Sequence, residues 1–169
     1  MTVTITKDNV PALIKAIRAL TKKEVLIGVP AENNDRPPAP GEDAEFGNAD
    51  IGYINEFGSP LQNIPPRPFL VPGSERVLPE AATRLKKGAQ AALSGDKSAV
   101  ENEFMNAGQI CINSVKDMIQ AGLAPPLSPK TIRARERRLK MPAGSLADSK
   151  ALIDTGAFIA SLTYVVKDK

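Results

Sequence analysis

Cys111 is the side chain of this sequence with the most useful chemistry, because a thiolate is a strong nucleophile. Such a nucleophile is normally activated by a neighbouring base, most often histidine, and the 169 residues contain no histidine and no second cysteine. Cys111 falls instead on the apolar stripe of a predicted helix, where a free cysteine packs as a small hydrophobic residue. The serines also lack a base arrangement, so we predict no catalytic residues and no enzyme activity.

Three neighbouring acidic residues, Glu42, Asp43 and Glu45, could do chemistry of another kind by binding a cation. Carboxylate oxygens are good calcium ligands, but the regular spacing of a calcium-binding loop is missing. A solvated acidic loop is therefore the favoured interpretation. No glycine-rich phosphate loop occurs in the sequence either, so we predict neither a metal site nor a cofactor.

A strongly basic run lies between residues 130 and 140, which contain six basic residues and one acid, Glu136. The basic residues are Lys130, Arg133, Arg135, Arg137, Arg138 and Lys140. Three interpretations are open: a solvated face, contact with an acidic surface of another subunit, and binding to a DNA backbone. Because no aromatic residues interleave with the charges, a stacking platform for single-stranded bases is not indicated.

Residues 58–73 form a proline-rich arm, with five prolines between positions 60 and 72. Proline fixes φ and removes a backbone donor, so we expect the arm to be extended. A stiff arm loses little entropy on docking, and one interpretation is that Phe69 and Leu70 anchor it on a partner while Arg67 forms a polar clamp. On that interpretation the monomer folds without either anchor. The alternative is a surface connection packed on its own domain.

The elements that position these groups follow from apolar periodicity and from turn residues. Strands are predicted at 2–6, 25–29 and 162–167, and helices at 10–20, from 48 or 50 to 57, 74–94, 98–121, 129–139 and from about 155 to 161. The excursion at 30–48, with four prolines, cannot bury apolar surface by itself. Asp154 or Thr155 is expected to cap the last helix.

This order of elements predicts a single α+β domain over residues 1–169. We expect a small mixed or antiparallel sheet, made from the N-terminal strands and the C-terminal strand and covered by the long central helix. Apolar residues make up 42% of the chain and aromatic residues 4%, so the core should be aliphatic. Basic residues exceed acids only 22 to 19, and no leader or membrane-spanning run is seen, so a soluble protein is expected.

Three stretches resemble the neck and tail-completion proteins of tailed bacteriophages. They read GYINEFGSPLQNIPPRPFLVPG at 52–73, PPLSPKTIRARERRL at 125–139 and ALIDTGAFIASLTYVV at 151–166. The shared pattern is a helix ending in EFG, an IPxRPF arm, an LSPxTI helix and an LIDTG ending. The residues that match it are Phe57, Gly58, Ile64, Pro65, Arg67, Pro68, Phe69, Leu127, Ser128, Pro129, Thr131, Ile132, Ile153, Asp154, Thr155 and Gly156.

This resemblance implies a structural virion protein at the head-to-tail junction, assembled in the host cytoplasm. Such proteins complete or cap the tail tube as a ring, expected to be sixfold by analogy with tail tubes, and join the tube to head-side connector proteins. DNA would pass through the ring without sequence-specific binding. The pattern does not separate a tail terminator from a stopper or another completion factor.

A ring needs one patch of each subunit to meet a different patch on the next. The acidic residues at 42–45 and the basic helix are candidates for these two patches, and the arm is a third interface candidate. The full set of interface candidates is Glu42, Asp43, Glu45, Phe57, Arg67, Phe69, Leu70, Arg133, Arg135, Arg137 and Arg138. The alternative function is a small nucleic-acid-binding module that uses the basic helix at 129–140.

Overall fold

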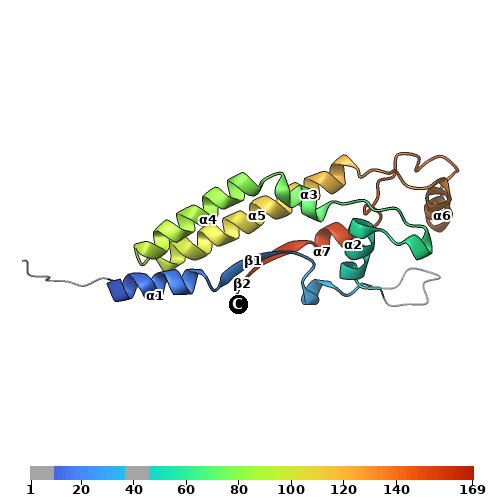
Figure 1. The fold of residues 1–169 in the computed structure, drawn as a ribbon. Helices are drawn as coiled ribbons and strands as arrows, with labels where there is room; N and C mark the ends of the chain where they lie inside the picture. Colours follow the sequence, from blue (N-terminus) through green and yellow to red (C-terminus); the bar gives the residue numbers. More distant parts are fainter. Residues whose placement is uncertain (1–9, 37–45) are drawn as a thin grey trace, which may run out of the picture.

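The computed structural model describes residues 10–36 and 46–169 (Figure 1), so the predicted strand at 2–6 and the acidic residues at 42–45 lie outside the described residues. The helices are α1 (Val10–Leu20), α2 (Asn48–Phe57), α3 (Leu70–Glu75), α4 (Leu78–Leu93), α5 (Lys97–Ala121), α6 (Pro129–Leu139) and α7 (Ala157–Ser161). The strands are β1 (Lys23–Gly28) and β2 (Thr163–Asp168), and short 3-10 turns occur at Ala31–Asn33 and Pro60–Gln62.

The strands β1 and β2 pair antiparallel, with Leu26 opposite Val165, and α5 packs on both. The predicted α+β class, with a small antiparallel sheet covered by a long central helix, is therefore confirmed. The close approach depends on Gly108 in α5, because a Cβ atom there would lie 2.4 Å from Cδ2 of Tyr164 in β2. A real Cβ does not tolerate that distance, so the glycine sets how closely the helix can lie on the sheet.

The helices α4 and α5 lie side by side along the long axis of the molecule (Figure 1). The α5 helix begins at Asp96, whose side chain accepts a hydrogen bond from the Ala99 N–H at 2.9 Å, and it ends at Gly122, where φ is 104°. The helix predicted at 74–94 is divided in the structure, because residues 74 and 75 belong to α3 and a separate helix starts at Leu78. Proline in the first turn of α4 explains this start, since it fits there and not in a helix interior.

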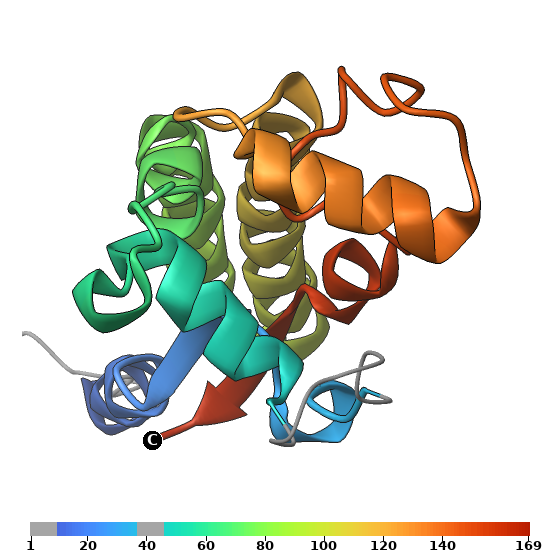
Figure 2. The same ribbon diagram turned by 90° about the vertical axis from the view of Figure 1, so that its right-hand side faces the viewer.

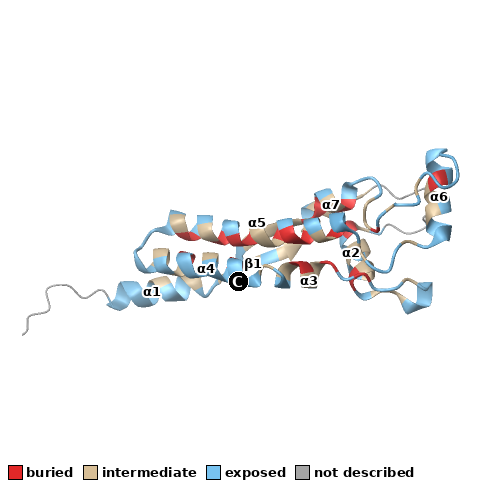
Figure 3. Cartoon of the chain, turned by 90° about the horizontal axis from the view of Figure 1, so that it is seen from above, coloured by how far each residue is buried: buried red, intermediate tan, exposed pale blue. Residues whose placement is uncertain are grey.

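The hydrophobic core lies where α3, α5 and α7 meet. Its buried members are Phe69, Ile112, Val115, Ile119, Phe158 and Leu162. The rings of Phe69 and Phe158 meet edge to face, with centroids 5.6 Å apart. Figure 3 shows the buried residues following one side of α5 into this region. The core is thus mainly aliphatic but is centred on one aromatic pair.

Helix α1 lies at one end of the elongated molecule and α6 at the other (Figure 1). The apolar stripe of α1 that the sequence predicts is present, but no residue of α1 is buried. Val10, Leu13, Ile14 and Ile17 keep between 41% and 57% of their surface exposed, although α1 contacts α4. An amphipathic helix normally covers such a stripe, but the residues that the structure describes leave the apolar face of α1 about half exposed.

The two described ends of the predicted 30–48 loop lie together. The Asn48 N–H donates to the carbonyl of Asn34 at 2.8 Å, and Nε of Arg36 donates to the carbonyl of Phe46, also at 2.8 Å. These bonds join the loop ends at the start of α2. None of the helices among the described residues has the length and apolar character needed to cross a membrane.

Candidate functional site

Arg67 is buried and bound within its own chain, with 6% of its surface exposed. Its Nε donates to the carbonyl of Pro125 at 2.6 Å, and one terminal nitrogen donates to the carbonyl of Pro126 at 3.0 Å. The guanidinium therefore ties the arm to the connection between α5 and α6. The prediction that Arg67 clamps a partner is wrong, because its donors point inward.

The predicted anchor Phe69 is also internal, with 1% of its surface exposed in the hydrophobic core. The arm is not extended over its whole length, since α3 starts at Leu70, which is half-buried. Pro72 is tolerated there because the N–H groups of a first helical turn have no partner within the helix. The structure thus favours the alternative interpretation, in which the arm packs on its own domain.

Glu56, the acid of the EFG stretch, holds the start of α3, and sequence reasoning missed this role. Its carboxylate is 7% exposed and accepts hydrogen bonds from the N–H groups of Phe69 at 2.7 Å, Leu70 at 2.9 Å and Val71 at 3.1 Å. A carboxylate at a helix N-terminus satisfies unpaired donors and complements the helix dipole. Capping rules consider residues within one turn, so a cap 13 residues upstream gives no local signal.

Phe57 precedes the arm and is an interface candidate whose side chain is mostly exposed, with 62% of its surface accessible. It lies next to the exposed ring of Tyr53, with centroids 4.9 Å apart, on the outer side of α2. Its interface role stays a prediction.

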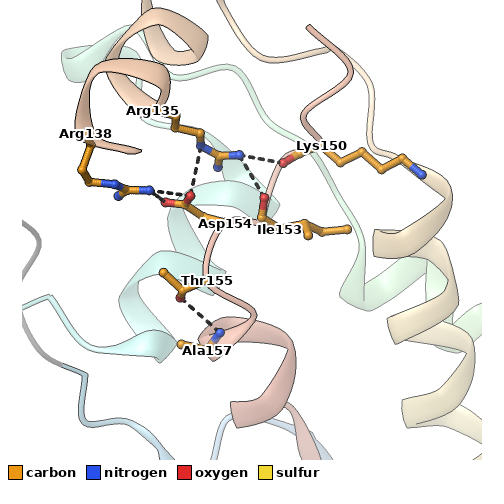
Figure 4. Close-up of polar contacts among 7 residues, drawn as sticks. All are labelled: Arg135, Arg138, Lys150, Ile153, Asp154, Thr155 and Ala157. Carbon is orange, nitrogen blue, oxygen red and sulfur yellow. Dashed lines mark hydrogen bonds and ion pairs between the residues drawn. The ribbon is translucent and has the colours of Figure 1, made fainter. Parts of the chain in front are cut away.

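The basic residues of α6 fall into two groups. The first consists of Arg135 and Arg138, which both contact Asp154 (Figure 4). Arg138 donates to Oδ1 of Asp154 at 2.5 Å and to Oδ2 at 2.6 Å. Arg135 lies 3.7 Å from the same carboxylate and donates to the carbonyls of Lys150 at 3.2 Å and Ile153 at 2.9 Å. These two arginines hold α6 against the segment before α7, where Arg135 is half-buried and Arg138 stays exposed. Their interface role stays a prediction.

The environment acts in opposite directions on the two guanidinium groups. Burial lowers the pKa of Arg135, while the hydrogen bond that Arg138 donates to Asp154 raises the pKa of Arg138. Both stay charged at neutral pH because an arginine pKa lies far above it. Asp154 binds these arginines, and the N-cap of α7 is Gly156, so the prediction that Asp154 or Thr155 is the N-cap is wrong. Thr155, one residue before the N-cap, accepts a hydrogen bond from the Ala157 N–H at 3.3 Å.

Glu136, the single acid of the basic run, is buried. Its Oε1 accepts hydrogen bonds from the N–H groups of Gly144 at 2.8 Å and Leu146 at 3.1 Å. The carboxylate therefore organises the loop after α6 and does not neutralise the outer face of the helix.

The second group of α6 cations makes no contact with Asp154. These cations are exposed, and they include the interface candidates Arg133 and Arg137. Pairing of this group with Glu42, Asp43 and Glu45 stays a prediction, because those acids lie outside the described residues.

In the part of the chain that the structure describes, Cys111 is not an activated nucleophile and the carboxylates do not form a metal site. Burial raises the pKa of the Cys111 thiol, which keeps it protonated at neutral pH. Within residues 10–36 and 46–169, no group of three or more histidine, cysteine or acidic residues is arranged to hold a metal ion. A cavity of about 290 Å³ lies between α6 and residues 146–154, and its wall includes the paired Arg135 and Asp154.

Comparison of the chain with models of known protein families, with curated proteins and with solved structures finds no match.

Replacing Asp154 with asparagine should loosen α6, because both arginines lose their anionic partner. Hydrogen bonds to charged groups contribute about 1.5–3 kcal/mol, so we expect the free energy of unfolding to fall by about 2 kcal/mol. Hydrogen exchange should speed up in α6 before it does in α5. The control is Asp148→Asn, which removes an exposed acid of the same segment that has no ion pair among the described residues. Equal effects of the two changes would contradict the role of Asp154.

Proposed function

We propose that this chain is a structural virion protein of the bacteriophage neck, which completes or caps the tail tube as a ring and joins it to the head. The sequence resemblance suggests this role, and the way the structure uses the matching residues supports it. Arg67 fastens the arm, Asp154 fastens α6, and Ser128 caps α6 by accepting the Thr131 N–H at 3.1 Å. The residues that match the resemblance thus hold the elements of the chain together, as a subunit of an assembly requires.

The observation that carries the proposal is the apolar face of α1, which the described residues leave about half exposed. Four aliphatic residues at helical spacing, about half exposed, lie at one end of an elongated subunit (Figure 3). Burying them would contribute about 25 cal/mol for each Å² of apolar surface removed from water. We propose a second copy of this chain as the occupant, because a ring subunit must offer each neighbour a patch of its own. The remaining partners would be the tail tube protein and head-side connector proteins.

The test is a complementation experiment with phage particles that lack this protein. Negative-stain images should show full heads beside separate tails, and added purified protein should restore joined, infectious particles. The variant Leu13→Glu with Ile17→Glu should fold, because both side chains are exposed, but should fail to restore joining. The control Lys15→Glu with Arg18→Glu changes two exposed positions of the same helix and should restore it. Joined particles formed without the protein would refute the proposal.

A further inference from the structure

Three cations of α6 and the following Lys140 remain once the two arginines bound to Asp154 are set aside. They are Lys130, Arg133, Arg137 and Lys140, and all four are exposed. At 3.6 residues per turn, the first three lie within about 60° of one another around the helix. Lys140 follows directly at the C-terminal end. At about 1.5 Å per residue, this basic stripe is about 15 Å long.

The basic stripe carries uncompensated charge within the described part of the chain. The ion pairs of α6 there are those of Arg135 and Arg138 with Asp154, and none involves a member of the stripe. The one acid of the helix, Glu136, is buried and binds backbone N–H groups. The fold therefore divides the cations at 130–140 into two that pair with Asp154 and four exposed ones without an ion pair among the described residues.

The composition of the basic stripe fits a phosphate backbone better than a protein surface. Protein interfaces are rich in aromatic residues and poor in lysine at their centre, whereas the stripe has two lysines and no aromatic residue. Arginine matches phosphate geometry with paired N–H donors. Phosphates of one B-DNA strand follow each other at about 3.4 Å along the axis, so a stripe of this length spans about four of them.

The position and the rigidity of α6 also suit this partner. Figure 2 looks onto the end of the molecule that α6 occupies, with α6 on the viewer's side. The contacts of Arg135, Arg138 and Glu136 fix the helix, so its cations are presented without further ordering of the backbone. We infer that the basic stripe binds the backbone of duplex DNA without reading its sequence. This inference does not depend on the neck assignment.

The test is fluorescence anisotropy with a labelled 20-base-pair duplex of arbitrary sequence, titrated with the full chain from 50 to 200 mM salt. Each phosphate contact adds about 0.9 to the negative slope of log affinity against log salt. Four contacts predict a slope of about −3.6, which is a loss of about 100-fold over this range. A second duplex of unrelated sequence should bind equally well.

The variant carries Lys130→Gln, Arg133→Gln, Arg137→Gln and Lys140→Gln and should lose nearly all of this slope. Its control removes the same formal charge from four exposed cations elsewhere, Lys15, Arg18, Lys86 and Lys87, each replaced by glutamine. The control should keep the wild-type slope. Circular dichroism checks that both variants fold.

Two results would overturn the inference. The first is equal loss of slope in the variant and its control, which would mean that net charge alone drives binding. The second is no DNA binding by the wild-type chain at 50 mM salt. If the stripe variant then still failed to restore particle joining, the stripe would face an acidic protein surface. The complementation result for α1 is independent of these outcomes, so the two proposals can fail separately.

Discussion

Replacing Phe69 with alanine should lower the free energy of unfolding by about 3–5 kcal/mol, the range for truncating a buried phenylalanine. The ring lies in the hydrophobic core, against Phe158, with 1% of its surface exposed. Its loss removes an apolar side chain and leaves a cavity that the neighbouring helices fill only in part. Urea denaturation followed by circular dichroism measures the change, and the melting temperature should fall on the order of 10 °C.

The matched control is Phe57→Ala, a change of the same chemistry on the same side of the molecule. Phe57 is 62% exposed and contacts the equally exposed ring of Tyr53, so its truncation should cost less than about 1 kcal/mol. If Phe69→Ala were as mild as Phe57→Ala, the arm would not belong to its own core. The interpretation of Phe69 as an anchor for a partner would then return.

Local patterns in the sequence predicted the elements of the fold well. The apolar repeat of α5, the Ser128 and Pro129 start of α6 and the glycine that ends α2 each act within one or two helical turns. Such signals can be read without knowledge of the tertiary structure, because propensity and capping are set by neighbours in the chain. A small sheet that includes the C-terminal strand was also predicted, and this strand pairs with β1.

The arm was misinterpreted because its function in the fold depends on distant residues. Glu56 caps a helix that starts 14 residues later, and Arg67 binds carbonyls that are 58 and 59 residues away in the sequence. A proline-rich segment looks stiff and exposed when it is considered alone. Only the tertiary structure shows that a buried carboxylate and a buried guanidinium hold its second half, between Arg67 and Val71.

The basic helix shows the same limit for charge. Counting residue types gives six cations and one acid between positions 130 and 140, and that count cannot tell which cations are neutralised. Asp154, 16 residues beyond Arg138, removes two of them, and Glu136 turns inward. The surface charge of α6 therefore depends on Asp154, an ion-pair partner that the helical periodicity of the sequence does not reveal.

Replacing Glu56 with alanine should be the second large effect, a loss of about 3 kcal/mol or more in the free energy of unfolding. The change leaves the N–H groups of Phe69, Leu70 and Val71 without an acceptor, and an unsatisfied buried donor costs about 1–3 kcal/mol. Glu56→Gln should be milder, because its amide oxygen can still accept from part of this set. Thermal and urea denaturation of both variants measure the difference.

The control for Glu56 is Asp50→Ala, which removes a carboxylate that caps a helix start in the ordinary local way. Asp50 accepts one hydrogen bond, from the exposed Gly47 N–H at 2.9 Å, so its loss should cost about 1 kcal/mol. A larger cost for Glu56 would show that the long-range cap joins α2 to the core element that begins at Phe69. Equal, small costs would instead mean that water replaces the carboxylate, and that the arm is fixed by the packing of Phe69 alone.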